Sequence, residues 1–440
     1  MSLSTDTPDS QSLTESPSAS NRPRRGLRAG PLRLRDFRLL IFGQMVSTVG
    51  DMFYAVALPW FVLANGGTPR DLGIVLAAYG IPRAASVLLG GSLSDRVQPR
   101  RMMLLADIAR ALLVGGLAVI TLFDIHTLWV LCVIAAPLGA FEGIFLPASM
   151  AMLPSILSDD DLQAGNAINM ATAQFSVLVG PGVGGVIVAS VRSGVAFMVD
   201  AITFLVSAAS LAAMRGTRAA HHAVVENPMA DSLAPDEPGI AAETAEPKTF
   251  WALLRQSRLL QTGLAVSIVG NLAFGALTEV ALPDLAHGPL HAGATGFGIM
   301  VSAFGAGSLV GSLLGATMGK LPRRGLMALL LGLVQALFLA VIPFTGGLPG
   351  AAISIAAWGV ANAVSNVLLI TLIQQRLPRA LLGRIMGAFM FANFGLYPIS
   401  VAVGGVVVDR LGPAIIFPIT GGMLFLAILY GLFQPELRDL

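Results

Sequence analysis

The sequence predicts an all-helical, polytopic membrane protein with twelve transmembrane helices in two pseudo-symmetric six-helix bundles. Three observations support this prediction. Hydrophobic residues make up 55% of the 440 residues and charged residues only 12%, against about 45–50% and 25% in soluble chains. Apolar runs of roughly 20 residues, long enough to cross a bilayer core, recur along the chain. The second half of the sequence also repeats the first.

The apolar runs fall into two sets. The first set predicts helices at residues 38–64, 72–94, 102–122, 128–157, 163–189 and 195–214. The second set predicts helices at 258–283, 296–318, 325–344, 350–376, 384–408 and 411–434. An acidic, Ala- and Pro-rich stretch between the sets breaks the apolar pattern. We therefore expect an N-terminal bundle at residues 36–214 and a C-terminal bundle at 258–434, joined by a cytoplasmic linker at 215–257. A disordered basic cytoplasmic tail is expected at residues 1–35, and a short cytoplasmic tail at 435–440.

Basic residues gather in the loops on one side of the predicted bundles. An arginine cluster precedes the first run, and further basic residues follow the second, sixth, eighth and tenth runs. The only basic residues in the loops on the other side are Arg70, Arg192 and Arg410. Because positive residues mark the cytoplasmic side, we expect both termini to be cytoplasmic. All basic residues except Lys248 and Lys320 are Arg, a bias typical of GC-rich genomes that favours a bacterial inner (plasma) membrane.

The two sets of helices share a register. A constant shift of about 220 residues places Arg38, Leu39 and Leu40 on Arg258, Leu259 and Leu260, and Gly184 and Gly185 on Gly404 and Gly405. One register that holds across several helices predicts two homologous bundles, related by an axis along the membrane normal.

The sequence lacks the motifs that most enzyme classes require. Cys132 is the single cysteine, which excludes an internal disulfide, and the five histidines form no HExxH zinc motif. No GxxxxGK[ST] loop is present, which argues against ATP hydrolysis by this chain. We therefore expect no enzymatic activity, no metal, no cofactor and no nucleic-acid partner, and we expect a monomer surrounded by membrane lipid.

Three ionisable residues fall midway along helices of the first set. They are Asp51, Glu142 and Arg83, and the repeat replaces Asp51 by Asn271 and Glu142 by Asn362. Ionisable groups inside a bilayer are expensive and mostly functional. A carboxylate in a low dielectric has a raised pKa, which a nearby arginine lowers again. The three residues therefore predict a proton-coupling site. The alternative is that Arg83 holds one acid in a permanent ion pair.

The balance of charge favours the coupling site. We expect Arg83 to be the only basic group at this depth in the first half, so that two acids and one arginine leave one acid over. Asp107 and Arg110 are one turn apart near the inner end of the third helix, where they are expected to pair with each other or with the adjoining loop. Asp200 lies nearer the end of its helix and is expected to be a structural hydrogen-bonding group or a helix cap.

A group of aromatic and polar residues predicts a substrate cavity between the halves. Its members combine apolar rings with hydrogen-bonding groups at membrane depth, and only Glu279 among them is charged. The candidate residues are Phe53, Tyr54, Phe145, Asn271, Glu279, Trp358, Asn362 and Asn393.

Two glycine-containing motifs carry further hypotheses. Gly91, Asp95, Arg96, Arg100 and Arg101 span the end of the second helix and the following loop. An aspartate among small residues can accept from an arginine or a helix N-terminus across the bundles, which predicts a conformational latch. The second motif, Gly180, Pro181, Gly184 and Gly185, is expected to interrupt the fifth helix, because proline removes a backbone hydrogen bond. The alternative is a kink without a functional role.

These features resemble a known family. Six plus six helices with a long central linker, and the stretch from Gly91 to Arg101, look like the major facilitator superfamily. The stretch from Gly180 to Gly185 is similar to the helix-5 motif of its exporters. Residues 36–51 and 57–60 resemble the branch that contains the enterobactin exporter and macrolide efflux proteins. The resemblance implies a secondary active exporter that works as a drug or metabolite/proton antiporter.

We therefore expect a transporter that exports a small hydrophobic compound, such as a drug, siderophore or metabolite, in exchange for protons by alternating access. Its substrate would bind near the bilayer midplane between the halves. One alternative is a lysophospholipid flippase or an uncoupled facilitator. A more remote alternative is a membrane sensor or scaffold that has lost transport, with the linker or tail binding a partner.

Overall fold

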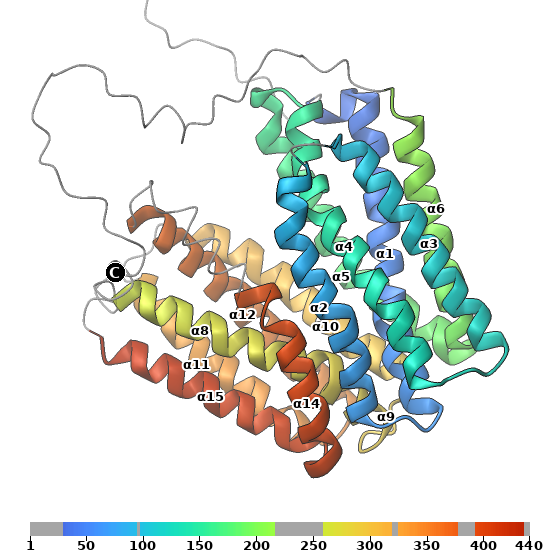
Figure 1. Ribbon diagram of the computed structural model, residues 1–440. Coiled ribbons are helices and arrows are strands. Elements are labelled where there is room, and N and C mark those ends of the chain that lie inside the picture. The colour runs from blue at the N-terminus through green and yellow to red at the C-terminus, as the bar shows by residue number, and fades with distance from the viewer. Residues whose placement is uncertain (1–29, 95–96, 216–257, 319–323, 377–391, 435–440) are drawn as a thin grey trace, which may run out of the picture.

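The computed structural model describes residues 30–94, 97–215, 258–318, 324–376 and 392–434, which form helices joined by short turns (Figure 1). In the first half, a 3-10 turn at Pro31–Arg33 leads into six helices. They are α1 (Arg35–Ala64), α2 (Pro69–Ser94), α3 (Pro99–Leu122), α4 (Leu128–Ile156), α5 (Asp159–Ser190) and α6 (Ser193–Ala213).

The second half is built in the same way, with more short elements. Its elements are α8 (Arg258–Gly275), the π-helical η3 (Ala276–Ala281), α9 (Leu282–His287), α10 (Gly293–Met318), α11 (Arg324–Val341), η4 (Ile342–Phe344), α12 (Leu348–Arg376), α14 (Tyr397–Leu411), η5 (Pro413–Ile415) and α15 (Ile416–Leu432). Among the described residues, 11 helical stretches are long and apolar enough to cross a membrane. The remaining long helix is α2, which packs between α4 and α14. The predicted fold class is confirmed.

Glycine contacts hold the helices of each bundle together in matching places. Gly139 on α4 lies against the backbone of Tyr79 on α2, and its repeat mate Gly359 on α12 lies against the backbone of Phe304 on α10. In lipid, helices associate through close van der Waals packing instead of hydrophobic burial, so small residues at these crossings stabilise the bundles.

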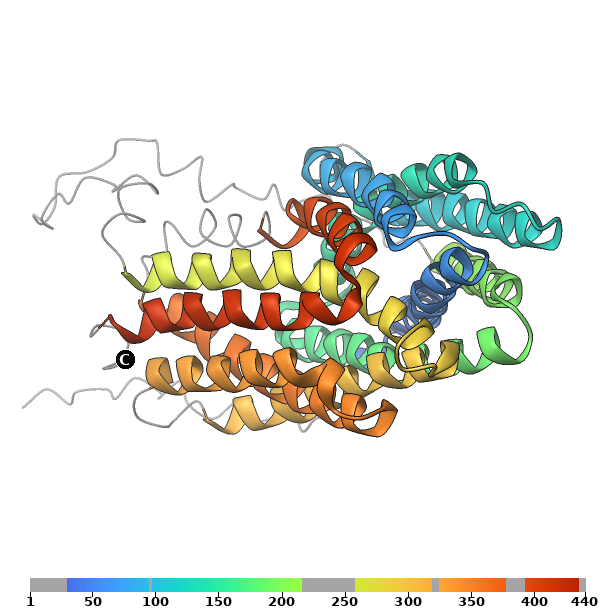
Figure 2. The ribbon, with the colours of Figure 1, turned by 90° about the horizontal axis from the view of Figure 1, so that it is seen from below.

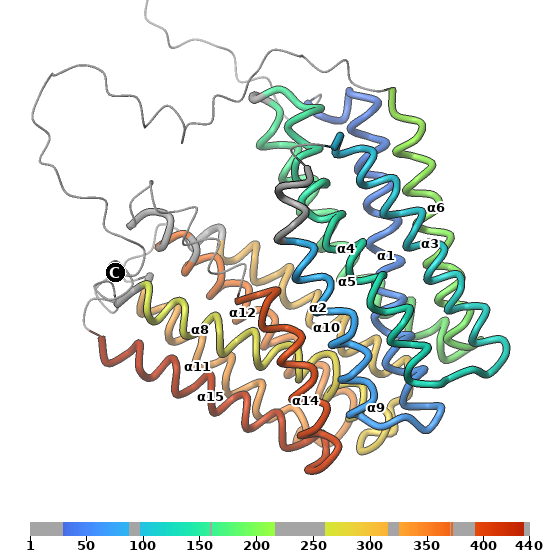
Figure 3. The backbone as a smooth tube through the Cα atoms, viewed as in Figure 1, coloured from blue at the N-terminus to red at the C-terminus, as the bar shows by residue number. Residues whose placement is uncertain are grey.

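The two bundles meet along two helix pairs and diverge from there (Figures 1 and 2). Helix α5 packs against α10, and α2 packs against α14. At these seams Gly73 lies beside Gly405, and Gly185 lies beside Gly298. The bundles separate toward the ends where α1 begins, α6 ends and α8 begins, as the backbone trace also shows (Figure 3). The two bundles are therefore in contact on one side and apart on the other.

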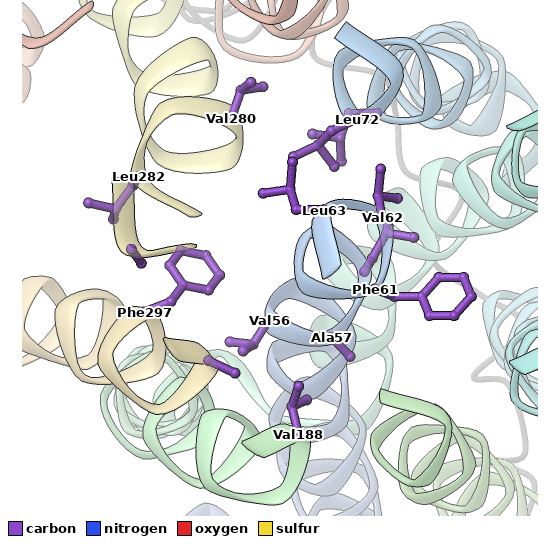
Figure 4. Close-up of a cluster of buried hydrophobic side chains, with 14 of the residues drawn as sticks. Val56, Ala57, Phe61, Val62, Leu63, Leu72, Val188, Val280, Leu282 and Phe297 are labelled. Atoms are coloured by element: carbon purple, nitrogen blue, oxygen red, sulfur yellow. The ribbon is translucent and has the colours of Figure 1, made fainter. Parts of the chain in front are cut away.

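A cluster of buried apolar side chains closes the same side. It joins Val56 and Leu63 of α1 to Val280, Leu282 and Phe297 of the second half (Figure 4). Val280 is fully buried although it lies in the π-helical turn. The cluster thus seals the two bundles to each other beyond the midpoint of α1.

Two predicted helices differ from those observed. Helix α5 runs from Asp159 to Ser190 without interruption, with Pro181 inside it, so the predicted break is wrong. The helix predicted at 384–408 is broken, because a turn at residues 395–396 precedes α14, where Pro398 lacks the amide hydrogen that a continuous helix would use. The first part of that prediction, residues 384–391, lies outside the described residues.

Candidate functional site

A polar cavity of about 320 Å³ lies between the bundles at the middle of the helices. Each of α1, α2, α3, α4 and α6 contributes one charged residue to its wall. These residues are Asp51, Arg83, Arg110, Glu142 and Asp200. The second half contributes Asn271, Glu279, Asn393 and Tyr397 among others. Five helices of the first half therefore bring charged groups together at one point of the interface.

Two ion pairs organise this cavity. The Nη2 atom of Arg83 lies 2.7 Å from Oε1 of Glu142, and each side chain is 25% exposed. The Nη2 atom of Arg110 lies 2.6 Å from Oδ1 of Asp51. Arg110 is only 3% exposed, whereas Asp51 is 32% exposed and faces the cavity. Each predicted acid thus has an arginine of its own.

The second pair corrects the sequence analysis. Arg83 was expected to be the only basic group at this depth, but Arg110 lies at the midpoint of the 24-residue α3. Arg110 does approach Asp107, as predicted, at 3.7 Å, but its shorter contact crosses to α1. Its guanidinium also lies 4.0 Å from the centroid of the Phe204 ring. The helix midpoint was the sequence signal that could have identified this residue.

The surplus of acid is also different from the one predicted. Asp51, Glu142 and Arg83 were expected to leave one acid over, but Arg110 balances that acid. Asp200 is 1% exposed and lies well inside α6, so the expectation of a helix cap is wrong. Its only hydrogen bond to another side chain among the described residues comes from Thr203, at 3.3 Å. Asp107, Asp200 and Glu279 are therefore acids in excess of the two arginines, and acids at this depth are costly to keep without a role.

A second cavity of about 670 Å³ lies mainly in the second half. Phe274, Phe304 and Trp358 form one of its walls, with ring centroids 4.6 to 6.0 Å apart. Amide and hydroxyl groups are spaced among the apolar residues, including those of Gln174, Ser308, Asn362 and Asn366. The two cavities share four lining residues, which are Met52, Ala55, Phe274 and Glu279. They are therefore adjacent, one charged and one mostly apolar.

Six of the eight predicted cavity residues line these spaces. Tyr54, Asn271 and Asn393 line the polar cavity, Trp358 and Asn362 line the apolar one, and Glu279 lines both.

The other two predicted cavity residues line neither space. Phe53 is 6% exposed and packs against Gly184, while the Phe145 ring lies 5.4 Å from the Arg110 guanidinium. Both belong to the packing that supports the cavity, because their helix faces turn toward neighbouring helices.

The glycine motif of α5 lies in the seam between the bundles. Gly180 and Gly184 face α1, while a Cβ added to Gly185 would lie 2.6 Å from the carbonyl oxygen of Ala294 on α10. The amide of Gly182 donates a 2.9 Å hydrogen bond to the hydroxyl of Ser302, also on α10. Together with Pro181, these residues let α5 approach both neighbours closely.

The predicted latch falls largely outside what the structure describes. Asp95 and Arg96 lie outside the described residues, and so does the side-chain environment of the turn that contains Gly91. Arg100 donates two 2.8 Å hydrogen bonds to the carbonyl oxygens of Leu211 and Ala212 at the end of α6. Arg101 is exposed. The described contacts of Arg100 therefore stay within the first bundle, and the latch remains a prediction.

Two bundles that enclose central cavities, closed on one side and diverging on the other, define a two-bundle membrane transporter. The profile of the Major Facilitator Superfamily matches residues 40–399. The chain belongs to this superfamily. Among the described residues, no group of three or more His, Cys, Asp or Glu side chains is placed to hold a metal ion.

Known relatives extend over nearly the whole chain. The multidrug efflux pump Tap of Mycolicibacterium fortuitum is 26% identical over 415 residues, which cover 91% of this chain and 96% of Tap. The enterobactin exporter EntS of Citrobacter koseri is 26% identical over 408 residues, covering 91% of this chain and 92% of EntS. The crystal structure of a D-xylose-proton symporter superposes with a TM-score of 0.67 at 15% identity, covering 92% of this chain and 98% of the symporter.

Proposed function

We propose that this protein is a proton-driven efflux transporter of the bacterial inner membrane, which exports a small hydrophobic compound in exchange for protons. The similarity to Tap and EntS, both named as exporters, supports the direction of transport. The charged cavity supports proton coupling, because carboxylates at this depth can exchange protons with water that reaches them.

The observation that carries the proposal is the pair of arginine–carboxylate contacts facing the cavity. A proton that binds Glu142 removes the charge that holds Arg83. The guanidinium of Arg83 also lies 5.2 Å from the ring of Phe394, which belongs to the second half. A change in the charge of Glu142 therefore alters a contact between the bundles, which links protonation to their relative orientation.

The asymmetric closure of the molecule supports alternating access. If both termini are cytoplasmic, as the distribution of basic residues predicts, the diverging side faces the cytoplasm and the structure is inward-facing. Protonation of Asp51 or Glu142 from outside favours the return to this state. Exchange to the outward-facing state requires the α5–α10 and α2–α14 seams to open on the closed side.

The apolar cavity is the proposed substrate site. Its volume of about 670 Å³ lies within the range of about 300–1,000 Å³ for small-molecule sites. The rings of Phe274, Phe304 and Trp358 offer flat apolar surface, and Asn362 and Asn366 offer hydrogen bonds at one end. This combination fits a hydrophobic compound with a few polar groups.

Neutralising the acids tests the coupling. In proteoliposomes, Asp51→Asn and Glu142→Gln are expected to abolish export against a substrate gradient while retaining downhill exchange, because only the proton step is lost. Asp124→Asn, in an exposed loop, is the matched control and is expected to export normally. Unchanged uphill export in both acid variants would contradict the proposal and favour an uncoupled facilitator or a lysophospholipid flippase.

A further inference from the structure

Helix α8 contains a side chain inserted into its backbone. The Ser400 hydroxyl on α14 donates a hydrogen bond to the carbonyl oxygen of Leu272 and accepts one from the amide of Ala276, at 2.8 Å. Leu272 and Ala276 are four residues apart, so a regular α-helix would join these two groups directly. The hydroxyl of Ser400 replaces that bond, and the π-helical turn of Ala276–Ala281 follows at once.

The surrounding residues are built for this insertion. Ser400 is 3% exposed. A Cβ on Gly275 would lie 2.8 Å from the Ser400 hydroxyl, and a Cβ on Gly404 would lie 2.5 Å from the Cβ of Ala276. Both helices thus have glycine where they must approach. Insertion of a side chain into the helix ladder is a recognised cause of deformation, and π turns are frequent at functional sites.

The internal repeat provides a comparison within the molecule. Under the shift of 220 residues, Ser400 corresponds to Gly180 and Leu272 corresponds to Met52. Gly180 packs directly against the side chain of Met52, and α1 continues as an α-helix through this region. The π turn therefore occurs in the bundle that has the hydroxyl and is absent from the matching part of the bundle that has glycine.

Glu279 lies within the π turn and faces both cavities. Among the described residues, no ion pair or hydrogen bond engages its carboxylate, in contrast to Asp51 and Glu142, which each have an arginine. Phe274, whose ring face can attract a cation, also lines both cavities. Arg83 lines the same polar cavity but pairs with Glu142. A carboxylate that forms no ion pair at the edge of an apolar cavity is costly, and a positively charged ligand group would offset that cost.

We propose that the Ser400 hydroxyl holds the π turn of α8, and that this turn places the Glu279 carboxylate where it binds the positively charged group of a hydrophobic ligand in the apolar cavity. Glu279 is the binding residue and Ser400 is its positioning residue. The inference rests on the proposed function because it takes the apolar cavity as the substrate site. Without the hydroxyl, Leu272 can bond Ala276 directly, and a change of one residue in register turns the following side chains by about 100°.

Binding of matched probes to the full-length protein in detergent tests the site. Tetraphenylphosphonium carries a permanent positive charge, and triphenylphosphine oxide is a neutral analogue. Isothermal titration is expected to show that the wild type prefers the cation. Glu279→Gln is expected to lose about tenfold or more in affinity for the cation and little for the neutral probe, because only the charge contact is removed.

Variants of Ser400 separate positioning from folding. Ser400→Ala is expected to lose the preference for the cation as Glu279→Gln does, and Ser400→Thr, which keeps the hydroxyl, is expected to restore it. In the double variant the two losses should not add, since both act through one carboxylate. Ser365→Ala is the matched control, because Ser365 donates a 3.2 Å hydrogen bond to the carbonyl of Ala328 between helices of the same bundle.

Three results would overturn the inference: a wild type without preference for the cation, a Glu279→Gln variant that retains it, or additive losses in the double variant. The proposed function fails separately. If Asp51→Asn and Glu142→Gln leave uphill export intact while Glu279→Gln loses the preference for the cationic probe, the coupling proposal is wrong and the cation site stands.

Discussion

At the scale of single residues, the polar cavity contains one pair, Arg110 and Asp51, in which the arginine is much more deeply buried than the acid. Arg110 is enclosed by Asp51, Asp107 and the ring of Phe204. Its partner Asp51 is the more exposed member of the pair. Water in the cavity therefore reaches Asp51 more readily than Arg110.

Arg110→Gln is expected to destabilise the protein, because it removes the positive charge from a buried ion pair. Removing one partner of a buried pair costs roughly 3–5 kcal/mol, and we expect the lower end because Asp51 is partly exposed. The thermal midpoint in detergent should fall by several degrees. Adding Asp51→Asn should restore part of the loss, with Asp107 accounting for the remainder.

Arg70→Gln, at an exposed position, serves as the control and should leave the midpoint unchanged. A double variant of Arg110 and Asp51 that is less stable than Arg110→Gln alone would contradict the assignment of this ion pair.

The acids could be predicted from the sequence, but the details of their pairing could not. Asp51 and Glu142 stand out because the repeat replaces both by asparagine. Which face of a helix points to a cavity is barely encoded when nearly every position is apolar, since such a helix has no distinct polar stripe. Phe53 and Phe145 were misplaced for this reason.

At the scale of elements, glycines decide where the bundles touch. Gly185 and Gly298 lie against each other in the α5–α10 seam, and Gly73 and Gly405 do so in the α2–α14 seam. The sequence motif at Gly180–Gly185 predicted a break in the fifth helix instead of these contacts. It could not reveal that one face meets α1 and another meets α10, because that depends on how the two bundles are arranged.

Gly185→Val is expected to weaken the closed seam, because its Cβ would overlap the backbone of Ala294 on α10. In a Cys132→Ser background, Phe297→Cys introduces a buried reporter thiol. When Gly185→Val is added, this thiol should react several-fold faster with a membrane-impermeant maleimide added from the closed side. Gly422→Val is the matched control, since no atom lies within 4 Å of a Cβ at that position. Equal rates in the two variants would contradict the role of this seam.

The π turn was beyond sequence analysis, whereas Pro398 was a local signal for the broken helix before α14. The contact between Ser400 and Leu272 spans 128 residues, and no local pattern in α8 indicates it. Both irregular elements contribute to the polar cavity, through Glu279 and Tyr397. Local rules of helix formation fail here because a long-range contact replaces a backbone hydrogen bond.

At the scale of the whole molecule, the repeat has become asymmetric in chemistry while it remains symmetric in fold. Glu142 lines the polar cavity in the first half, and its mate Asn362 lines the apolar cavity in the second. The fold could be predicted because the bilayer restricts spanning segments to long apolar helices. Which side of the molecule is closed could not be predicted, because one sequence must support both the inward-facing and the outward-facing state.

Proton movement in proteoliposomes loaded with a pH dye tests the central claim most directly. A gradient of an exported compound is expected to drive protons in the opposite direction in the wild type, because protonation in the polar cavity and substrate binding in the apolar cavity are linked through the orientation of the two bundles. Glu142→Gln should abolish this movement while it still exchanges the compound downhill. Substrate flux without proton movement in the wild type, or equal proton movement in Glu142→Gln, would contradict the assignment of Glu142 and its arginine pair as the coupling site.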